Sequence, residues 1–398
     1  MKLLPTILLM ALCSACAACG APVGRVQPDL VPLSPDVPPS RWALTEAAHE
    51  ELPPDPPVET ARIRVIAAGD NVVHPSIRID AARRSADGGH DFLPMYADAA
   101  DYIAAADAAF INQETLMGGD EMGFSGYPRF NGPQQMGRDL AALGFDVVNI
   151  ANNHMADKGE AGLAGTIDFF ESLPEITLIG GYRDAADYDD IRVTEHGGLR
   201  VAWLSYTEHT NGMSLPRTTA LVAPYTDDED IVRQCALAEE IADVTIVSVH
   251  WGDENRPVNA EQRRLAALMS EHGADVILGH HPHVLQPIEW IGDTLCAYSL
   301  GNLASGMADW KNMIGGFLEF ELVQMSDGAV RVENPAFVPT VFHYGANNLG
   351  THLYFLRDYT EALAAKHGTG HIYGSRATAA DMRAYAEKIM GDFLRIDP

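Results

Sequence analysis

Three histidines stand within four residues in the stretch Gly279-His280-His281-Pro282-His283. They follow an apolar run over residues 274–278, which is typical of a buried strand. Such a strand would deliver the imidazoles to the carboxyl edge of a sheet, where α/β proteins bind their ligands. Neutral imidazole is a preferred ligand of transition metals. A surface histidine tract would instead stand in polar, low-complexity sequence, so the pattern predicts a metal site.

Polar residues also follow four other predicted strands. These strands cover residues 62–68, 109–112, 145–150 and 244–249, and the residues after them are Asp70, Glu114, Asn153 with His154, and His250. Each alone has an ordinary explanation: a helix cap, a solvated carboxylate, an Asn-Asn turn or a satisfied core histidine. Because ligands bind beyond the carboxyl ends of strands in α/β sheets, we expect all five strand ends to converge on one site.

Strand-like and helix-like segments alternate from residue 62 onward. Apolar spacing predicts helices over residues 101–108, 134–143, 162–172, 227–242 and 260–272, and further strands over residues 177–179, 200–206 and 295–298. This alternation predicts an α/β layered fold.

Composition excludes one class of partner. The chain has 398 residues, of which 47% are hydrophobic and 21% are charged, as in an ordinary globular protein. Its net charge of −28 argues against a nucleic-acid partner, because it offers nothing to neutralise a run of phosphates. We interpret this negative charge as one that keeps the surface of an exported protein solvated.

Residues 1–19 have the features of a secretory leader. An apolar run over residues 7–12 follows Lys2 and precedes small residues, and it is too short for a stable membrane anchor. Cysteines at 13, 16 and 19 crowd its end in an arrangement similar to a bacterial lipobox. Cys16 is favoured narrowly over Cys19 as the lipidated residue, and a plain cleaved signal peptide is the alternative. We therefore expect an exported protein, lipid-anchored on the outer face of the cytoplasmic membrane.

Three further segments follow the leader. Residues 20–60 hold ten of the 24 prolines and predict an extended stalk. We expect residues 61–306 to form the domain that carries the site. We expect residues 307–398 to form C-terminal strands and helices that pack on this domain. Cys235 and Cys296, the two cysteines outside the leader, are expected to be buried thiols rather than a bridge.

Six motifs in order resemble those of the CapA family of poly-γ-glutamate capsule synthesis proteins, within the calcineurin-like metallophosphoesterase superfamily. The resemblance runs from about Ile63 to Asn302. It is carried by residues 69–74, 112–114, 151–154 with Asp157 and Gly159, 250–252, 279–287 and 299–302. The resemblance implies a four-layer α-β-β-α sandwich, in which two mixed sheets are flanked by helices and a metal centre lies at their edge.

The resemblance also implies a role for each site residue. Asp70, His74 and His283 would hold one metal ion, Glu114 would bridge, and Asn153, His250 and His281 would hold a second ion. His154 would be the catalytic residue, which protonates the leaving group or stabilises the charged transition state. The remaining site candidates are Asn152, Asp157, His280, Gln286 and Asn302.

This chain departs from the superfamily pattern at three places. Asp70 and His74 stand four residues apart instead of two, the bridging position holds Glu114 instead of Asp, and His280 has no assigned role. The centre is therefore expected to hold either one divalent ion or two with altered geometry. Mixed imidazole, amide and carboxylate ligands favour Mn, Fe or Zn over calcium.

Two functions from different classes remain open at this point. The first is a metal-dependent hydrolase, phosphoesterase-like, acting in capsule or poly-γ-glutamate metabolism; a variant of it cleaves cell-wall peptide or polyglutamate bonds. The second is a non-catalytic accessory subunit of a membrane polyglutamate synthesis or export complex. Loops 117–131 and 208–226 carry no motif that identifies a substrate.

Overall fold

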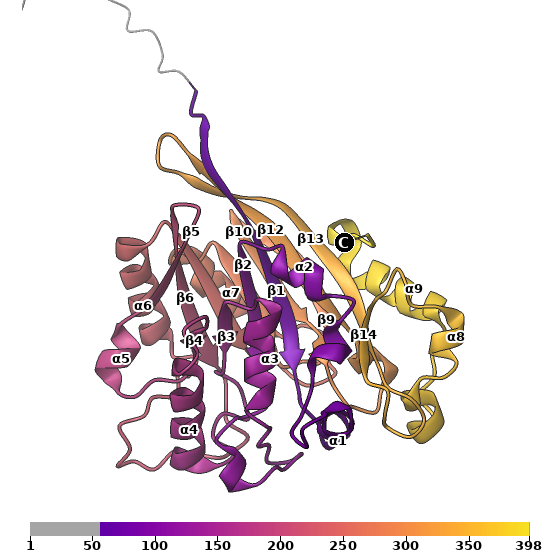
Figure 1. Cartoon of the computed structure of the whole chain (residues 1–398). Coiled ribbons are helices and arrows are strands. Elements are labelled where there is room, and N and C mark those ends of the chain that lie inside the picture. Colours follow the sequence, from indigo (N-terminus) through magenta and orange to yellow (C-terminus); the bar gives the residue numbers. More distant parts are fainter. Residues whose placement is uncertain (1–55, 398) are drawn as a thin grey trace, which may run out of the picture. The chain divides into compact units, whose positions relative to one another are not determined.

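Two mixed β-sheets lie face to face in the computed structural model, which describes residues 56–397 (Figure 1). The first sheet has the strand order β14-β13-β12-β1-β2-β3-β4, with β11 added beside β1. Strands β1 to β4 and β11 are parallel, whereas β12, β13 and β14 join antiparallel. Their bounds are β1 Glu59–Asn71, β2 Ala108–Gln113, β3 Val147–Asn149, β4 Thr177–Ile179, β11 Asn302–Ala304, β12 Ile314–Met325, β13 Val330–His343 and β14 His352–Phe355.

The second sheet has the order β5-β6-β7-β8-β10-β9. Its four central strands are parallel, and the two edge strands, β5 and β9, are antiparallel to their neighbours. The bounds are β5 Arg192–His196, β6 Leu199–Thr207, β7 Val244–His250, β8 Val276–His280, β9 Leu285–Ile291 and β10 Thr294–Leu300. The leader, both candidate lipidation cysteines and most of the predicted stalk lie outside the described residues.

Helices cover the outer face of each sheet. Buried side chains of α1, α3 and α4 pack on the first sheet, and those of α6 and α7 pack on the second. The helices are α1 Pro75–Arg84, α2 Ala100–Ala104, α3 Gln135–Leu143, α4 Gly159–Glu171, α5 Ala185–Asp189, α6 Asp228–Ile241, α7 Ala260–Glu271, α8 Glu361–Ala364 and α9 Ala379–Met390. These layers confirm the predicted fold of two mixed sheets flanked by helices.

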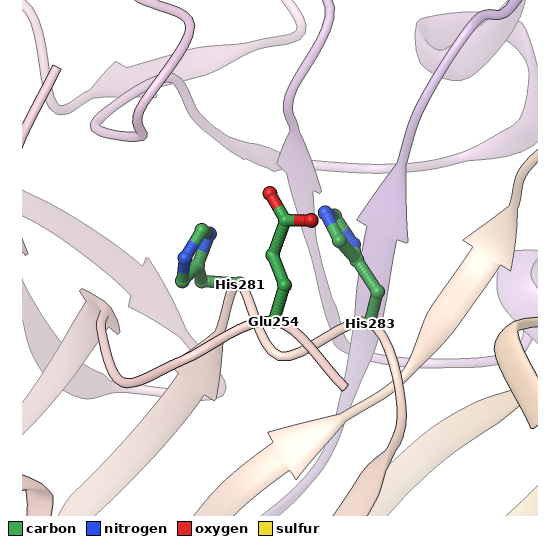
Figure 2. Close-up of side chains that lie close together, drawn as sticks. All are labelled: Glu254, His281 and His283. Atoms are coloured by element: carbon green, nitrogen blue, oxygen red, sulfur yellow. The ribbon is translucent and has the colours of Figure 1, made fainter. Parts of the chain in front are cut away.

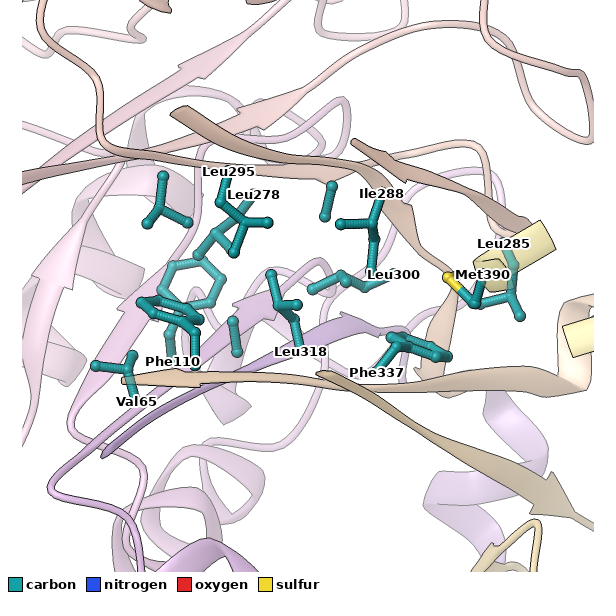
Figure 3. Close-up of a cluster of buried hydrophobic side chains, with 14 of the residues drawn as sticks. Val65, Phe110, Leu278, Leu285, Ile288, Leu295, Leu300, Leu318, Phe337 and Met390 are labelled. Atoms are coloured by element: carbon teal, nitrogen blue, oxygen red, sulfur yellow. The ribbon is translucent and has the colours of Figure 1, made fainter. Parts of the chain in front are cut away.

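The main hydrophobic core fills the space between the two sheets (Figure 3). Val65 of β1 and Phe110 of β2 face Leu278 of β8 and Leu295 of β10 across this space. Their neighbours in sequence, such as Ile66, point to the helical layer on the other side. Because side chains alternate along a strand, strands buried on both faces read as continuous apolar runs. For that reason these strands are easily recognised in the sequence.

Two glycines beside the site allow neighbouring strands to approach closely. A Cβ atom on Gly279 would lie 2.1 Å from the carbonyl oxygen of Tyr298, and one on Gly69 would lie 2.1 Å from the carbonyl oxygen of Gly301. No side chain fits at such a distance. The glycines that precede His280 and Asp70 are therefore required by backbone packing.

Some predicted boundaries are wrong. The helix expected over residues 101–108 ends at Ala104, because residues from Ala108 onward pair with β1 as strand β2. Strand β1 begins at Glu59, two residues inside the predicted stalk. Within the described residues, Cys235 and Cys296 are buried free thiols, as expected, and no helix there is long and apolar enough to cross a membrane.

Candidate metal centre

The carboxyl ends of β1, β2, β7 and β8 lie at the same edge of the two sheets. In the first sheet, Asp70 of β1 is in register with Asn112 of β2, and the Asn112 amide donates to Asp70 Oδ1 at 2.7 Å. In the second sheet, His250 of β7 is in register with His280 of β8. Parallel pairing within each sheet thus brings polar residues far apart in sequence to one edge.

Asp70, Glu114 and His283 form the first cluster of the centre. One ligand atom of each lies within 4.8 Å of the others. His283 Nδ1 lies 3.1 Å from Asp70 Oδ2 and 2.9 Å from Asn302 Oδ1, and its Nε2 lies 3.4 Å from Glu114 Oε1. Because two oxygens accept from Nδ1, the imidazole is held with Nε2 directed at Glu114. A second partner that fixes the ring in this way is typical of a metal-ligating histidine.

Glu114 is the strongest indication that this cluster binds a cation. Its side chain is buried, and neither carboxylate oxygen has a hydrogen-bond partner within residues 56–397. A buried carboxylate without a hydrogen bond is costly even with the His283 ring 3.4 Å away, and a bound metal ion would offset that cost. The donor set of this cluster, two carboxylates and an imidazole, fits a divalent transition metal.

The residues of this cluster shift one another's pKa values. Burial raises the pKa of Glu114 well above its ordinary value, and the nearby Asp70 adds to the increase. Burial would also raise the pKa of Asp70, but contacts with His280 and His283 outweigh it and hold that pKa well below its ordinary range. Burial lowers the pKa of His283, yet Glu114 and Asp70 raise it to about 10. The carboxylates therefore stabilise a positive charge at this position.

Asn153, His250 and His281 form the second cluster. His250 Nε2 lies 3.0 Å from Asn153 Oδ1, and the rings of His250 and His281 have centroids 4.7 Å apart. The Nδ1 atoms of both histidines are buried and have no partner in the described part of the chain. Burial lowers the pKa of His250 well below its ordinary value and that of His281 to about 3. Both rings are therefore neutral, the form in which imidazole binds a metal.

An unusual backbone holds His281 and His283 in place. Both residues have positive φ values, 95° and 56°, which are uncommon for residues other than glycine. The His281 N–H donates to Asp70 Oδ2 at 3.2 Å. Strained backbone of this kind persists where the surroundings determine it strongly, and it concentrates at functional sites.

Glu254 joins the centre although its position in the sequence did not reveal it. Its carboxylate lies between His281 and His283 (Figure 2), and one ligand atom of each lies within 4.8 Å of the others. Glu254 is exposed, four residues after the end of β7. Its place in a loop just after a parallel strand is the one feature of the sequence that could have suggested it. His209, in the loop after β6, also lies close, with its ring centroid 5.1 Å from that of His281.

His154 lies beside the first cluster and is oriented by its neighbours. Its Nδ1 atom is 2.7 Å from Asp157 Oδ2, and its Nε2 atom is 3.9 Å from Glu114 Oε1. The side chain of Asn152 accepts the His154 N–H at 2.9 Å and donates to the Gln113 carbonyl at 3.1 Å. Asn152 and Asp157 therefore hold His154 in position.

The other predicted site residues have different surroundings. His74 Nδ1 accepts the Gly306 N–H at 3.1 Å, and burial lowers the pKa of His74 to about 4. His280 stacks on Phe110 at 5.6 Å between centroids, with its Nδ1 atom 3.3 Å from Asp70 Oδ1. Neither histidine belongs to a metal-ligating cluster of the described chain.

Asn302 contacts the loop that carries His281 and His283, whereas Gln286 contacts the neighbouring loop at Arg256. The Asn302 amide donates to the His283 carbonyl at 3.3 Å and to the Asn312 carbonyl at 2.9 Å. Gln286 lies in the wall of a neighbouring cavity and donates to the Arg256 carbonyl at 2.9 Å. Asn302 therefore holds the backbone at His283 in position, and Gln286 holds the backbone at Arg256.

The fold and the site define a two-sheet α/β protein with a buried carboxylate and imidazole centre at one edge. The family model described as "Bacterial capsule synthesis protein PGA_cap" matches residues 64–307. The chain therefore belongs to this family, which confirms the predicted resemblance to CapA proteins.

Two curated relatives carry related names. The PGA biosynthesis protein CapA of Bacillus subtilis (strain 168) is 34% identical over 197 residues, which cover 48% of this chain and 51% of the relative. The capsule biosynthesis protein CapA of Bacillus anthracis is 34% identical over 165 residues, 40% of each chain. The chain thus spans about half the length of the first of these two relatives and 40% of the second.

Among solved structures, a 5'-nucleotidase precursor from Thermus thermophilus is similar, with 13% identity and a TM-score of 0.42. The similarity covers 82% of this chain and 59% of that one.

Proposed function

We propose that this chain is an exported, lipid-anchored protein of capsule formation that binds one or two divalent metal ions and uses them to hydrolyse a phosphoester-like bond. The observation that carries the proposal is Glu114, a buried carboxylate without a hydrogen-bond partner in the described chain, beside Asp70 and His283. Membership of a capsule synthesis family supports the biological setting.

The residues of the two clusters would hold the metal. Asp70, Glu114 and His283 offer one set of donors, and Asn153, His250 and His281 offer another. Mn, Fe or Zn suits such mixed donors. A bound divalent ion supplies positive charge to the reacting centre and lowers the pKa of water.

In this proposal, His154 supplies a proton during the reaction. His154 donates its Nδ1 hydrogen to Asp157, which leaves the Nε2 atom facing the centre. In the imidazolium form, which carries a second proton on Nε2, His154 would give that proton to a departing oxygen and act as a general acid. Phe130 packs edge-on against the His154 ring at 4.7 Å between centroids and limits its rotation.

The test is metal content and turnover of the purified full chain. We expect one to two equivalents of Mn, Fe or Zn per chain by elemental analysis after expression in supplemented medium. We expect slow cleavage of a generic aryl phosphodiester that stops with chelator and returns with metal. A chain that takes up no transition metal would overturn the proposal.

The alternative is a non-catalytic subunit of a membrane polyglutamate synthesis complex. The names of the two CapA relatives, which refer to biosynthesis, favour this role. Bound metal without turnover, together with full capsule assembly by a His154→Ala chain, would replace the hydrolase with this subunit. Hydrolysis of polyglutamate or cell-wall peptide in place of a phosphodiester would keep the enzyme and change its substrate.

A further inference from the structure

A buried hydrogen-bond network lies next to the candidate metal centre. Asn71 ends β1 and Gln113 ends β2, and the two residues are partners in the register of these parallel strands. Asn71 follows the candidate ligand Asp70, and Gln113 precedes the candidate ligand Glu114. The Asn71 side-chain amide donates to Gln113 Oε1 at 2.6 Å, and both side chains are buried. This hydrogen bond therefore joins the segments that carry two of the candidate ligands.

Tyr96 closes this network on the side of the helices. It is the last residue of the 3₁₀ turn Leu93–Tyr96, and its fully buried side chain belongs to the hydrophobic cluster under α1, α3 and α4. Its hydroxyl donates to Asn71 Oδ1 at 2.7 Å. Burial raises the pKa of Tyr96 well above its ordinary value, so the hydroxyl keeps its proton and remains a donor. The Asn71 amide thus has a partner at each end, which fixes the direction in which it faces.

The other end of the network holds the backbone on both sides of Glu114. Gln113 Nε2 donates to the Thr115 carbonyl at 2.8 Å, and the Glu114 N–H donates to the Asn71 carbonyl at 3.2 Å. The Thr115 hydroxyl accepts the Val73 N–H at 2.8 Å. The chain that leaves β2 is therefore tied to the chain that leaves β1 through both backbone and side-chain groups.

Glu114 depends on this backbone for its position. Neither oxygen of its carboxylate has a hydrogen-bond partner within residues 56–397. The carboxylate is therefore directed toward the centre by the main chain that Gln113 holds, and not by hydrogen bonds of its own within the described chain. A metal ligand must be held to within about 0.5 Å of its productive position, so small movements of this backbone affect metal binding.

The same network reaches His154. The Gln113 carbonyl accepts the side-chain amide of Asn152 at 3.1 Å, and the Asn152 side-chain oxygen accepts the His154 N–H at 2.9 Å. Gln113 is therefore connected to the proposed proton donor as well as to the candidate bridging ligand. A shift of its backbone would move both groups together.

We propose that Tyr96 is a positioning residue of the metal centre. Its hydroxyl fixes the Asn71 amide, and that amide in turn fixes Gln113 and the backbone beyond it. Without the hydroxyl, Asn71 Oδ1 becomes a buried acceptor with no partner, which is costly, and a rotation of the amide to relieve that cost breaks the bond to Gln113. The inference rests on the proposed function for the metal at this centre, whereas Tyr96 itself belongs to neither candidate cluster.

The first test needs no metal. Tyr96→Phe removes the hydroxyl and keeps the buried ring. In the metal-free full chain we expect faster amide hydrogen exchange in peptides that contain Glu114 and in peptides that contain His154, measured by mass spectrometry. Tyr359→Phe is the matched control, because Tyr359 is also fully buried and its hydroxyl lies 2.8 Å from His343 Nδ1. The control should leave exchange in both sets of peptides unchanged.

The second test measures metal binding directly. The metal-free chain is titrated with Co²⁺, whose visible spectrum reports the geometry of its ligands. We expect Tyr96→Phe to weaken Co²⁺ binding at least about tenfold and to change the spectrum of the bound ion, as is usual when a group that orients metal ligands is removed. Tyr359→Phe should keep the affinity within about twofold and the spectrum unchanged, because distant substitutions act independently.

A double variant tests the route through Asn71. If Tyr96 acts through this residue, adding Tyr96→Phe to Asn71→Ala should weaken Co²⁺ binding no further than Asn71→Ala does alone. Fully additive effects would mean that Tyr96 reaches the centre by another route, and they would overturn the proposal.

Failure of this inference differs from failure of the proposed function. If Tyr96→Phe lowers thermal stability as Tyr359→Phe does but leaves exchange, Co²⁺ affinity and spectrum unchanged, Tyr96 is structural only and the inference is wrong. If Tyr96→Phe changes all three but the unmodified chain cleaves no phosphodiester, the positioning role stands and the proposed hydrolase is wrong. A chain that binds no metal would overturn the proposed function, and the exchange measurement alone then decides whether Tyr96 holds Glu114 and His154 in place.

Discussion

The Nδ1 atom of His154 lies 2.7 Å from the Oδ2 atom of Asp157, and both side chains are buried. The same carboxylate oxygen accepts the Phe130 N–H at 2.6 Å. Asp157 is therefore held by the backbone while it orients the imidazole. This arrangement leaves His154 Nε2 near Glu114 without making His154 part of either candidate ligand cluster.

The first prediction separates catalyst from ligand. We expect His154→Ala to keep its metal and lose about 10²–10⁴-fold in rate, the usual contribution of a positioned proton donor. His283→Ala should lose metal and activity together, because a ligand is missing. Elemental analysis of each variant beside its rate on the aryl phosphodiester makes the comparison. Release of metal by His154→Ala with retention by His283→Ala would invert the two roles.

The second prediction concerns Glu254. If its carboxylate is a ligand, Glu254→Gln should weaken metal binding at least about tenfold, as measured by calorimetric titration of the metal-free chain with Mn or Zn. The control is Asp253→Asn, which changes the neighbouring exposed carboxylate, one outside the ligand clusters. Unchanged affinity in Glu254→Gln would remove this residue from the centre and leave the other donors as they are.

The third prediction concerns the leader. Cys16→Ala with Cys19→Ala should block lipidation, alter processing and release the chain from membranes. Globomycin, which inhibits lipoprotein processing, should give the same shift in the unmodified chain. The readout is the membrane and soluble fractions after separation. A double variant that stays on the membrane would contradict the lipid anchor.

The fourth prediction concerns acid stability. Burial lowers the pKa of His343 to about 3, and His367, whose ring is 4.9 Å away, adds to the shift. In the unfolded chain His343 is therefore protonated as the pH falls through about 6.5, whereas in the folded chain it stays neutral until about pH 3. The stability that this neutral histidine contributes is complete above pH 6.5 and is lost as the pH falls toward the folded value.

We therefore expect His343→Gln to flatten the fall in the free energy of unfolding below pH 6.5 by up to about 1.4 kcal/mol per pH unit. Glutamine can still accept from the Tyr359 hydroxyl, which lies 2.8 Å from His343 Nδ1. Urea unfolding at a series of pH values gives the slope. The exposed His371→Gln serves as the control. Parallel slopes for His343→Gln and the unmodified chain would contradict the assignment.

The sequence by itself determined the fold class and the strand ends of the centre. Strands such as 244–249 and 274–278 are buried on both faces, so they appear as apolar runs that end in His250 and His280. Parallel pairing places such ends at one edge whatever the details of the loops. For that reason Asp70, Glu114 and His283 could be predicted as partners from the sequence.

Only the tertiary structure decided which atoms face one another. Glu254 enters the centre, His74 turns its Nδ1 atom to Gly306, and Gln286 supports Arg256 in the wall of a cavity. These outcomes depend on the paths of loops, which follow from contacts between segments distant in sequence and from positive φ values at His281 and His283. Local propensity and side-chain periodicity carry no record of such contacts, because both describe only neighbours along the chain.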